Sequence, residues 1–160
     1  MSALTLSTAQ AALVSLLTAA IANTTAYPAL ANVPLPVEQF DTDSEPTVDA
    51  ALAKEGVCIL SIFPWSSRIE DAGNGVQRLL ISLVVFVLEN KTQNLDTTNG
   101  GLNRNPLLII EDMWTAVTKA PMKGPQRFKL SDPLEPVNEG SGMRIWATNF
   151  ELESTYIPGT

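Results

Sequence analysis

The chain has 160 residues, of which 45% are hydrophobic and 17% are charged. This charged share lies below the ~25% usual for a soluble globular domain and favours a surface that partners partly cover. The net charge of −7 argues against specific nucleic-acid binding, because Lys and Arg must displace counterions from phosphates. The length predicts a single domain, residues 1–160, with one core.

The sequence also argues against an enzyme. It has no histidine, which removes the commonest general base and the commonest transition-metal ligand. The single cysteine, Cys58, excludes an internal disulfide, and its place in the apolar run Val57–Phe63 predicts an inert buried thiol. Glycine-rich phosphate loops and the G-x-S-x-G elbow are absent from the sequence. We therefore expect no catalytic residue, cofactor or metal.

The N-terminal segment predicts an amphipathic helix. Residues 1–26 carry no charged side chain, and without Lys or Arg before its apolar centre this stretch does not fit a secretion signal. Ser7 and Gln10 have capping-box spacing. The apolar residues that then recur at helical spacing are Leu6, Ala9, Leu13, Leu16, Leu17, Ala20 and Ile21. We expect a cytosolic helix that does not span a membrane.

Residues 27–47 hold four prolines and predict an extended, acidic arm, since each proline restricts its predecessor to extended geometry. Its acidic residues, together with one just beyond it, are Glu38, Asp41, Asp43, Glu45 and Asp49. Asp41, Asp43 and Glu45 have the spacing of the first half of a calcium-binding loop. Such a loop needs Gly at its sixth position and Glu at its twelfth, where this sequence has Pro46 and Leu52. Thr47 is expected to cap a short helix through Lys54 that stops at Gly56.

The middle of the chain predicts two strands and a loop. Val57–Phe63 indicates a buried strand. Gln77–Glu89 is apolar on both faces, which is typical of a central strand or of one whose second face meets another subunit. Residues 90–105 are rich in Asn and Gly, and a loop of this length is usually functional or disordered. Glu70 and Asp71 are expected in a turn.

The C-terminal part predicts one helix and two strands. Pro106 starts a helix through about Lys119, with Leu107, Ile110, Trp114 and Val117 on its apolar stripe. Residues 127–137 and 143–157 indicate strands that flank a turn. The fold class expected is α+β: a mostly antiparallel β-sheet flanked by two main α-helices, with the extended Pro-rich acidic arm.

Several residues are candidates for protein contacts. They are the arm residues Glu38, Asp41, Asp43 and Glu45, the loop residues Leu95, Asn99 and Asn103, and the basic residues Lys119, Lys123, Arg127 and Lys129. Three interpretations of the basic stretch stay open: a phosphate-binding site, a solvated loop, or a basic patch that pairs with the acidic arm of a neighbouring subunit. Trp65 is either a lid on the core or an exposed anchor.

The order of elements resembles the tail terminator proteins of tailed bacteriophages. The residues that carry the resemblance are the strand Arg78–Asn90, the Asn/Gly loop, the helix Asn105–Val117 with its Trp114, and the closing hairpin Phe128–Tyr156. The N-terminal helix, acidic segment and proline-ended strand match the layout of that family as well. The four-proline arm has no counterpart in it.

The resemblance implies a virion protein that forms a hexameric ring at the head-proximal end of the tail. Such a ring ends growth of the tail tube and leaves a channel through which genomic DNA passes without specific binding. It implies as partners other copies of the chain, the tail tube protein, the sheath where there is one, and a neck or head-completion protein. It implies assembly in the host cytoplasm. The alternatives are another neck subunit, a connector or stopper, and, from a different class, a monomeric binding or assembly-chaperone module.

Overall fold

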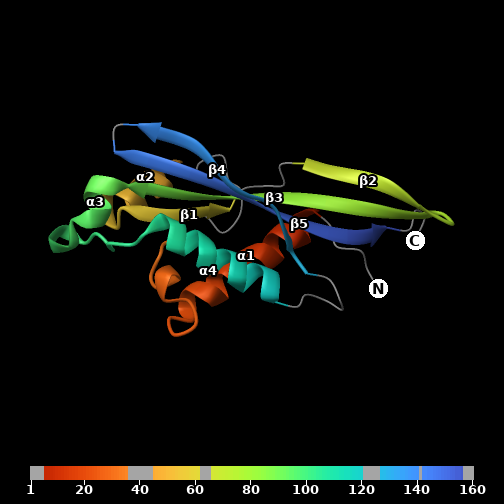
Figure 1. Cartoon of the computed structure of the whole chain (residues 1–160), viewed down its shortest axis with the longest axis horizontal. Helices are drawn as coiled ribbons and strands as arrows, with labels where there is room; N and C mark the ends of the chain where they lie inside the picture. The colour runs from red at the N-terminus through yellow and green to blue at the C-terminus, as the bar shows by residue number, and fades with distance from the viewer. Residues whose placement is uncertain (1–5, 36–44, 62–65, 121–126, 141, 157–160) are drawn as a thin grey trace.

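The computed structural model describes residues 6–35, 45–61, 66–120, 127–140 and 142–156. They form a five-stranded antiparallel sheet with helices packed on it, which is the α+β fold expected from the sequence (Figure 1). The strands are β1 (Val57–Ser61), β2 (Ser66–Gly73), β3 (Val76–Asn90), β4 (Lys129–Gly140) and β5 (Met143–Tyr156).

The long strand β3 lies at the centre of the sheet. It pairs with β5 over Gln77–Asn90 on one edge, and its other edge is shared by β2 and β1. The sheet order is β1-β3-β5-β4, with β2 beside β3. β3 is therefore a central strand, and on its second face Leu88 packs against the cluster that Val48 and Leu52 form with Cys58.

The two main helices, α1 (Leu6–Ala22) and α4 (Pro106–Lys119), pack on one face of the sheet (Figure 1). Four alternate residues of β3 point at them: Ile81, Leu83, Val85 and Val87. The fully buried side chains of this core include Leu13, Leu17, Ile81, Leu83, Val85, Val87, Ile109, Met113, Phe150 and Leu152. Because α1 begins at Leu6, Ser7 lies inside the helix and the expected capping box is wrong; Gln10 is buried instead.

The helix α2 (Glu45–Lys54) packs on the opposite face at the β1 end. Its Val48 and Leu52 pack against Cys58. The residues on either side of Cys58 in β1, Val57 and Ile59, belong to the main core on the other face of the sheet. The helix starts before Thr47, so the expected cap at that residue is wrong, but it ends at Lys54 as expected. Gly56 follows with φ +81°, the left-handed conformation that favours glycine after a helix.

The proline-rich stretch is not an extended arm over its first part. Residues Pro28–Leu30 form a 3₁₀ turn, η1, and Leu30 and Val33 are buried in the core. Asp112 of α4 holds this turn by accepting a hydrogen bond from the Ala29 amide at 3.0 Å. Apolar side chains between the prolines thus override their extended preference. Residues 36–44, which contain most of the acidic arm, lie outside the described residues.

Strand β2 was not predicted from the sequence. It pairs with residues Val76–Ser82 of β3 and makes a hairpin whose turn carries Gly73 and Gly75 at positive φ. Glu70 and Asp71 therefore belong to a strand, not to a turn. In Figure 1 this hairpin and the end of β5 project beyond α1 and α4 and give the molecule an elongated outline. We call this projecting part the hairpin end.

Candidate interaction surface

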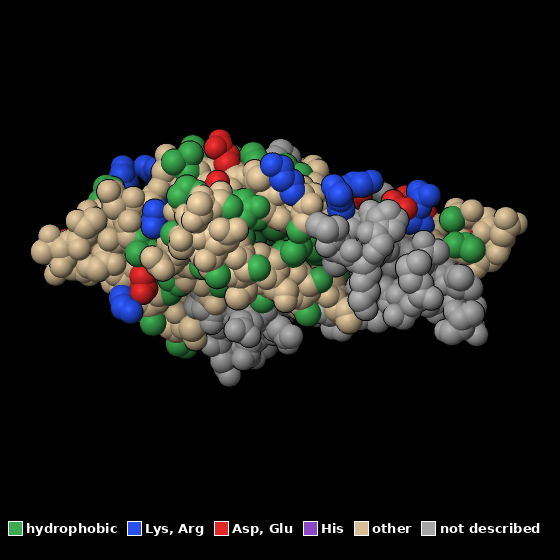
Figure 2. Space-filling view, turned by 90° about the horizontal axis from the view of Figure 1, so that it is seen from below, with side chains coloured by type: hydrophobic (Ala, Val, Ile, Leu, Met, Phe, Trp, Pro, Cys, Tyr) green, Lys and Arg blue, Asp and Glu red, His purple; other side chains and the backbone are tan. Residues whose placement is uncertain are grey.

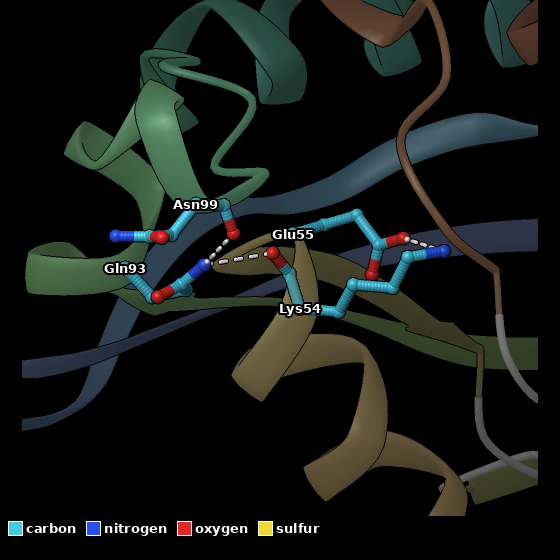
Figure 3. Close-up of polar contacts among 4 residues, drawn as sticks. All are labelled: Lys54, Glu55, Gln93 and Asn99. Atoms are coloured by element: carbon cyan, nitrogen blue, oxygen red, sulfur yellow. Dashed lines mark hydrogen bonds and ion pairs between the residues drawn. The ribbon is translucent and has the colours of Figure 1, made fainter.

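Residues 90–105, expected to form a long loop, fold into a compact, hydrogen-bonded segment. It contains the helix α3 (Lys91–Leu95) and the 3₁₀ helix η2 (Thr97–Asn99). The side chain of Gln93 donates to two carbonyls, that of Lys54 at 2.8 Å and that of Asn99 at 2.9 Å (Figure 3). The first bond fastens the segment to the end of α2, next to the Lys54–Glu55 ion pair at 3.2 Å, and the second closes the segment on itself.

Asn94 is the centre of this segment and is 1% exposed. Its Nδ2 donates to the Arg104 carbonyl at 2.7 Å and to Glu89 Oε2 at 3.1 Å, and its Oδ1 accepts from the Arg104 amide at 3.0 Å. One side chain thereby joins the two ends of the segment to the central strand. Nearly all of its bonding capacity is used, as buried amides require.

Glu89 is the buried carboxylate of this network, with 3% of its surface exposed. Burial raises its pKa above the ordinary value, while the positive charges of Arg144 and Lys91 and the hydrogen bond from Asn94 act in the opposite direction. A buried ionised carboxylate destabilises the fold unless these partners stay in place. The interactions of Glu89 therefore link the 90–105 segment to β3 and β5.

Three leucines on this side of the molecule point into solvent. Leu95 ends α3 with 57% of its surface exposed, and Leu107 and Leu108, in the first turn of α4, are 46% and 50% exposed. We call these three residues the leucine platform. The prediction that Leu107 lies on the apolar stripe of its helix is wrong, because α4 is rotated so that Ile109, Ile110 and Met113 face the sheet.

The other loop candidates lie in the same segment. Asn99 is exposed and its Nδ2 donates to Asp96 Oδ2 at 2.8 Å. Asn103 is exposed with φ +52°, and its amide donates to the Asn94 carbonyl at 2.7 Å. The structure therefore brings Leu95, Asn99 and Asn103 together on one folded segment. Their role in contacts stays a prediction.

The basic candidates that the structure describes are all exposed. Lys119 ends α4, Lys129 begins β4, and Arg127 lies two residues before that strand. In Figure 2, Lys and Arg side chains follow one border of the molecule from its middle towards the hairpin end. Glu38, Asp41, Asp43, Lys123 and Trp65 lie outside the described residues, and Glu45 begins α2. The pairing of the basic patch with an acidic arm stays a prediction.

Two findings bear on chemistry. Cys58 is buried, as the sequence predicted; burial, together with the negative charge of Glu55, raises the pKa of its thiol to about 12, which disfavours the reactive thiolate. Within the residues that the structure describes, no three His, Cys, Asp or Glu side chains come close enough together to hold a metal ion. No helix in that part of the chain is long and apolar enough to cross a membrane.

The residues that hold this surface in shape were not predicted from the sequence. Gln93 and Asn94 are ordinary polar residues in an Asn-rich stretch, and spacing alone does not separate a buried amide from a solvated one. Ile69, 59% exposed on β2, was missed with its strand. The signal for it was the alternation around Arg68-Ile69-Glu70, with one apolar residue between charges.

Comparisons with known proteins give no assignment. No protein-family model matches the chain. No curated protein matches it at a significant level.

Proposed function

We propose that this chain is a structural subunit that forms a ring at the head-proximal end of a bacteriophage tail, where it ends tube growth and joins the tail to the neck. The observation that carries the proposal is the leucine platform, which lies on and next to a segment that Gln93 holds to the end of α2 and Asn94 holds to β3. The resemblance of the sequences of β3, α4 and the β4–β5 hairpin to those of tail terminator proteins also supports the proposal.

A rigid surface of this kind suits binding. Single exposed leucines are common, but leucines on and next to a backbone segment that hydrogen bonds hold in place lose little conformational entropy when a partner covers them. The buried Asn94 and the two carbonyls held by Gln93 fix its shape before contact. Such preorganisation favours repeated contacts between identical subunits, as ring assembly requires.

The charge of the chain fits a subunit beside a channel for DNA. With a net charge of −7, such a ring repels the phosphate backbone and does not hold it. The proposed partners are therefore proteins: other copies of the chain, the tube protein, and a neck protein on the head side.

A tube-growth experiment tests this function. Purified tail tube protein is polymerised with and without the chain, and tube lengths are measured in electron micrographs. We expect the chain to cap one end of each tube and to stop elongation. Capping without arrest, or binding only to the head-side connector, would favour a connector or stopper. Absence of binding to tubes and connectors, with a monomer at every concentration, favours the binding or chaperone module and refutes the proposal.

A further inference from the structure

We propose that α2 is a displaceable cover, which opens from the sheet while the main core stays folded and so uncovers an apolar strip on the second face of the sheet. The cover is a segment of this chain, so the device is conformational and works in any assembly. Its test therefore does not depend on the proposed function.

The strip beneath α2 is separate from the core that α1 and α4 form. It crosses three neighbouring strands and consists of Cys58 and Leu60 of β1, Leu88 of β3 and Met143 of β5. We call these four residues the covered strip. The side chains of α2 that pack against it are Val48, Ala51 and Leu52, and none of them belongs to the main core. Opening of α2 therefore leaves the contacts of the main core in place.

Few interactions hold the first part of α2 to the sheet. Of residues 46–54, only Val48 and Leu52 are buried. Within the part of the chain that the structure describes, residues 46–53 form no hydrogen bond or ion pair with the sheet or with another helix. A helix of ten residues is marginal in water on its own, so α2 depends on these two side chains. Two buried side chains stabilise far less than a whole core, so α2 should open more readily than the domain unfolds.

The C-terminal end of α2 is fastened and supplies the point about which the helix opens. The Lys54 carbonyl accepts a hydrogen bond from Gln93 Nε2 at 2.8 Å, as Figure 3 shows. The next carbonyl, that of Glu55, accepts from the Leu102 amide at 3.1 Å. The 90–105 segment thus anchors this end, and the N-terminal end of α2 is the one that leaves the sheet.

Cys58 reports the opening, because it is the single cysteine of the chain and α2 packs over it. A disulfide reagent reaches the thiol when α2 opens or when the whole domain unfolds. A cover that is open about 1% of the time, a usual population for a minor conformation, slows the reaction roughly a hundredfold relative to the unfolded chain. A domain of ordinary stability is unfolded so rarely that the second route slows it by roughly a thousandfold or more.

The experiment follows the labelling of Cys58 in the full chain at urea concentrations below the unfolding transition, beside equilibrium urea unfolding. The test variant is Val48→Ala on α2, and the matched control is Val117→Ala on α4, a buried valine of the main core. We expect Val48→Ala to be labelled roughly tenfold faster than wild type, because two methyl groups leave the contact that holds α2 closed. Val117→Ala should lower the urea midpoint and be labelled at the wild-type rate, because it destabilises the closed and open forms alike.

A second variant weakens α2 without changing its contacts with the covered strip. Ala50 is exposed in the middle of the helix, where glycine is less favourable than alanine. We expect Ala50→Gly to speed the labelling of Cys58 by roughly fivefold. It takes the place of Val48→Ala if circular dichroism shows that the alanine variant does not fold.

The proposal predicts a labelling rate that urea scarcely changes below the transition, that both α2 variants raise, and that Val117→Ala leaves unchanged. Labelling that rises with urea in step with global unfolding would show that the thiol reacts only in the unfolded chain and would overturn the proposal. The same conclusion holds if Val117→Ala speeds labelling as much as Val48→Ala. If neither α2 variant changes the rate, α2 is not the cover and the proposal is wrong.

Discussion

Replacing Asn94 by alanine removes in one change three of the hydrogen bonds that hold the 90–105 segment in place. The amide donates to Glu89 and to the Arg104 carbonyl, and it accepts from the Arg104 amide. Asn94 is 1% exposed, so water does not readily replace these bonds. The buried carboxylate of Glu89 would lose one of the partners that favour its ionised form.

The expected loss follows from the count of bonds. A hydrogen bond contributes about 1 kcal/mol net to stability, and a bond to a charged group somewhat more, so Asn94→Ala should cost about 3 kcal/mol. That is a large share of the ~5–15 kcal/mol by which a domain is stable. With a urea m-value of about 2 kcal/mol per molar, the midpoint of unfolding falls by about 1.5 M.

The assay is equilibrium urea unfolding at a concentration where the chain is monomeric. The matched control is Asn99→Ala in the same segment, because Asn99 is exposed and donates to the exposed side of Asp96. We expect the control to cost ~0.5 kcal/mol or less. If Asn94→Ala and Asn99→Ala unfold at the same midpoint, the network does not hold the segment and the reasoning is refuted.

Three further predictions concern single residues. At Gly101 a Cβ would lie 1.9 Å from the Gln93 carbonyl oxygen, so Gly101→Ala should destabilise the chain by ~2 kcal/mol or more in urea unfolding; unchanged stability would contradict this. The Cys58 thiol, with its pKa raised to about 12, should react with a disulfide reagent at pH 8 about a hundredfold more slowly in the folded chain than in the unfolded one, and equal rates would refute its burial. The pKa of Glu89 is higher in the folded chain than in the unfolded chain. The free energy of unfolding therefore falls as the pH rises from the unfolded-state pKa through the folded-state pKa, and this loss is absent at lower pH. Glu89→Gln should therefore be more stable relative to wild type at pH 8 than at pH 4; the reverse slope in thermal melts would contradict this.

The parts of the fold that the sequence predicted are those with a strong local pattern. β3 is a long β-branched run, and its two apolar faces required a central place in the sheet. α4 begins at Pro106 because proline suits a helical first turn, and its N-cap Asn105 accepts from the Leu107 amide at 3.0 Å. In these elements local preference and tertiary packing agree, so the sequence alone was sufficient.

The parts of the fold that the sequence did not predict depend on contacts with residues far away along the chain. The segment Ser66–Gly73 has one large apolar residue and becomes a strand because residues 76–82 supply its ladder of hydrogen bonds. The turn at Pro28–Leu30 is held by Asp112, 83 positions from its partner Ala29. For the candidate surface, spacing identified Leu95, Asn99 and Asn103 but could not show that Asn94 is buried. Nor could it fix the rotation of α4 that exposes Leu107.

The number of copies of this chain on each tail tube tests the account most directly. Tubes of different lengths, assembled in the presence of the chain and freed of unbound protein, are weighed one by one by mass photometry, and their lengths are measured in electron micrographs. The account predicts the same added mass on every tube, equal to one ring, whatever the length of the tube. Added mass that grows with tube length, or none at all, would contradict it.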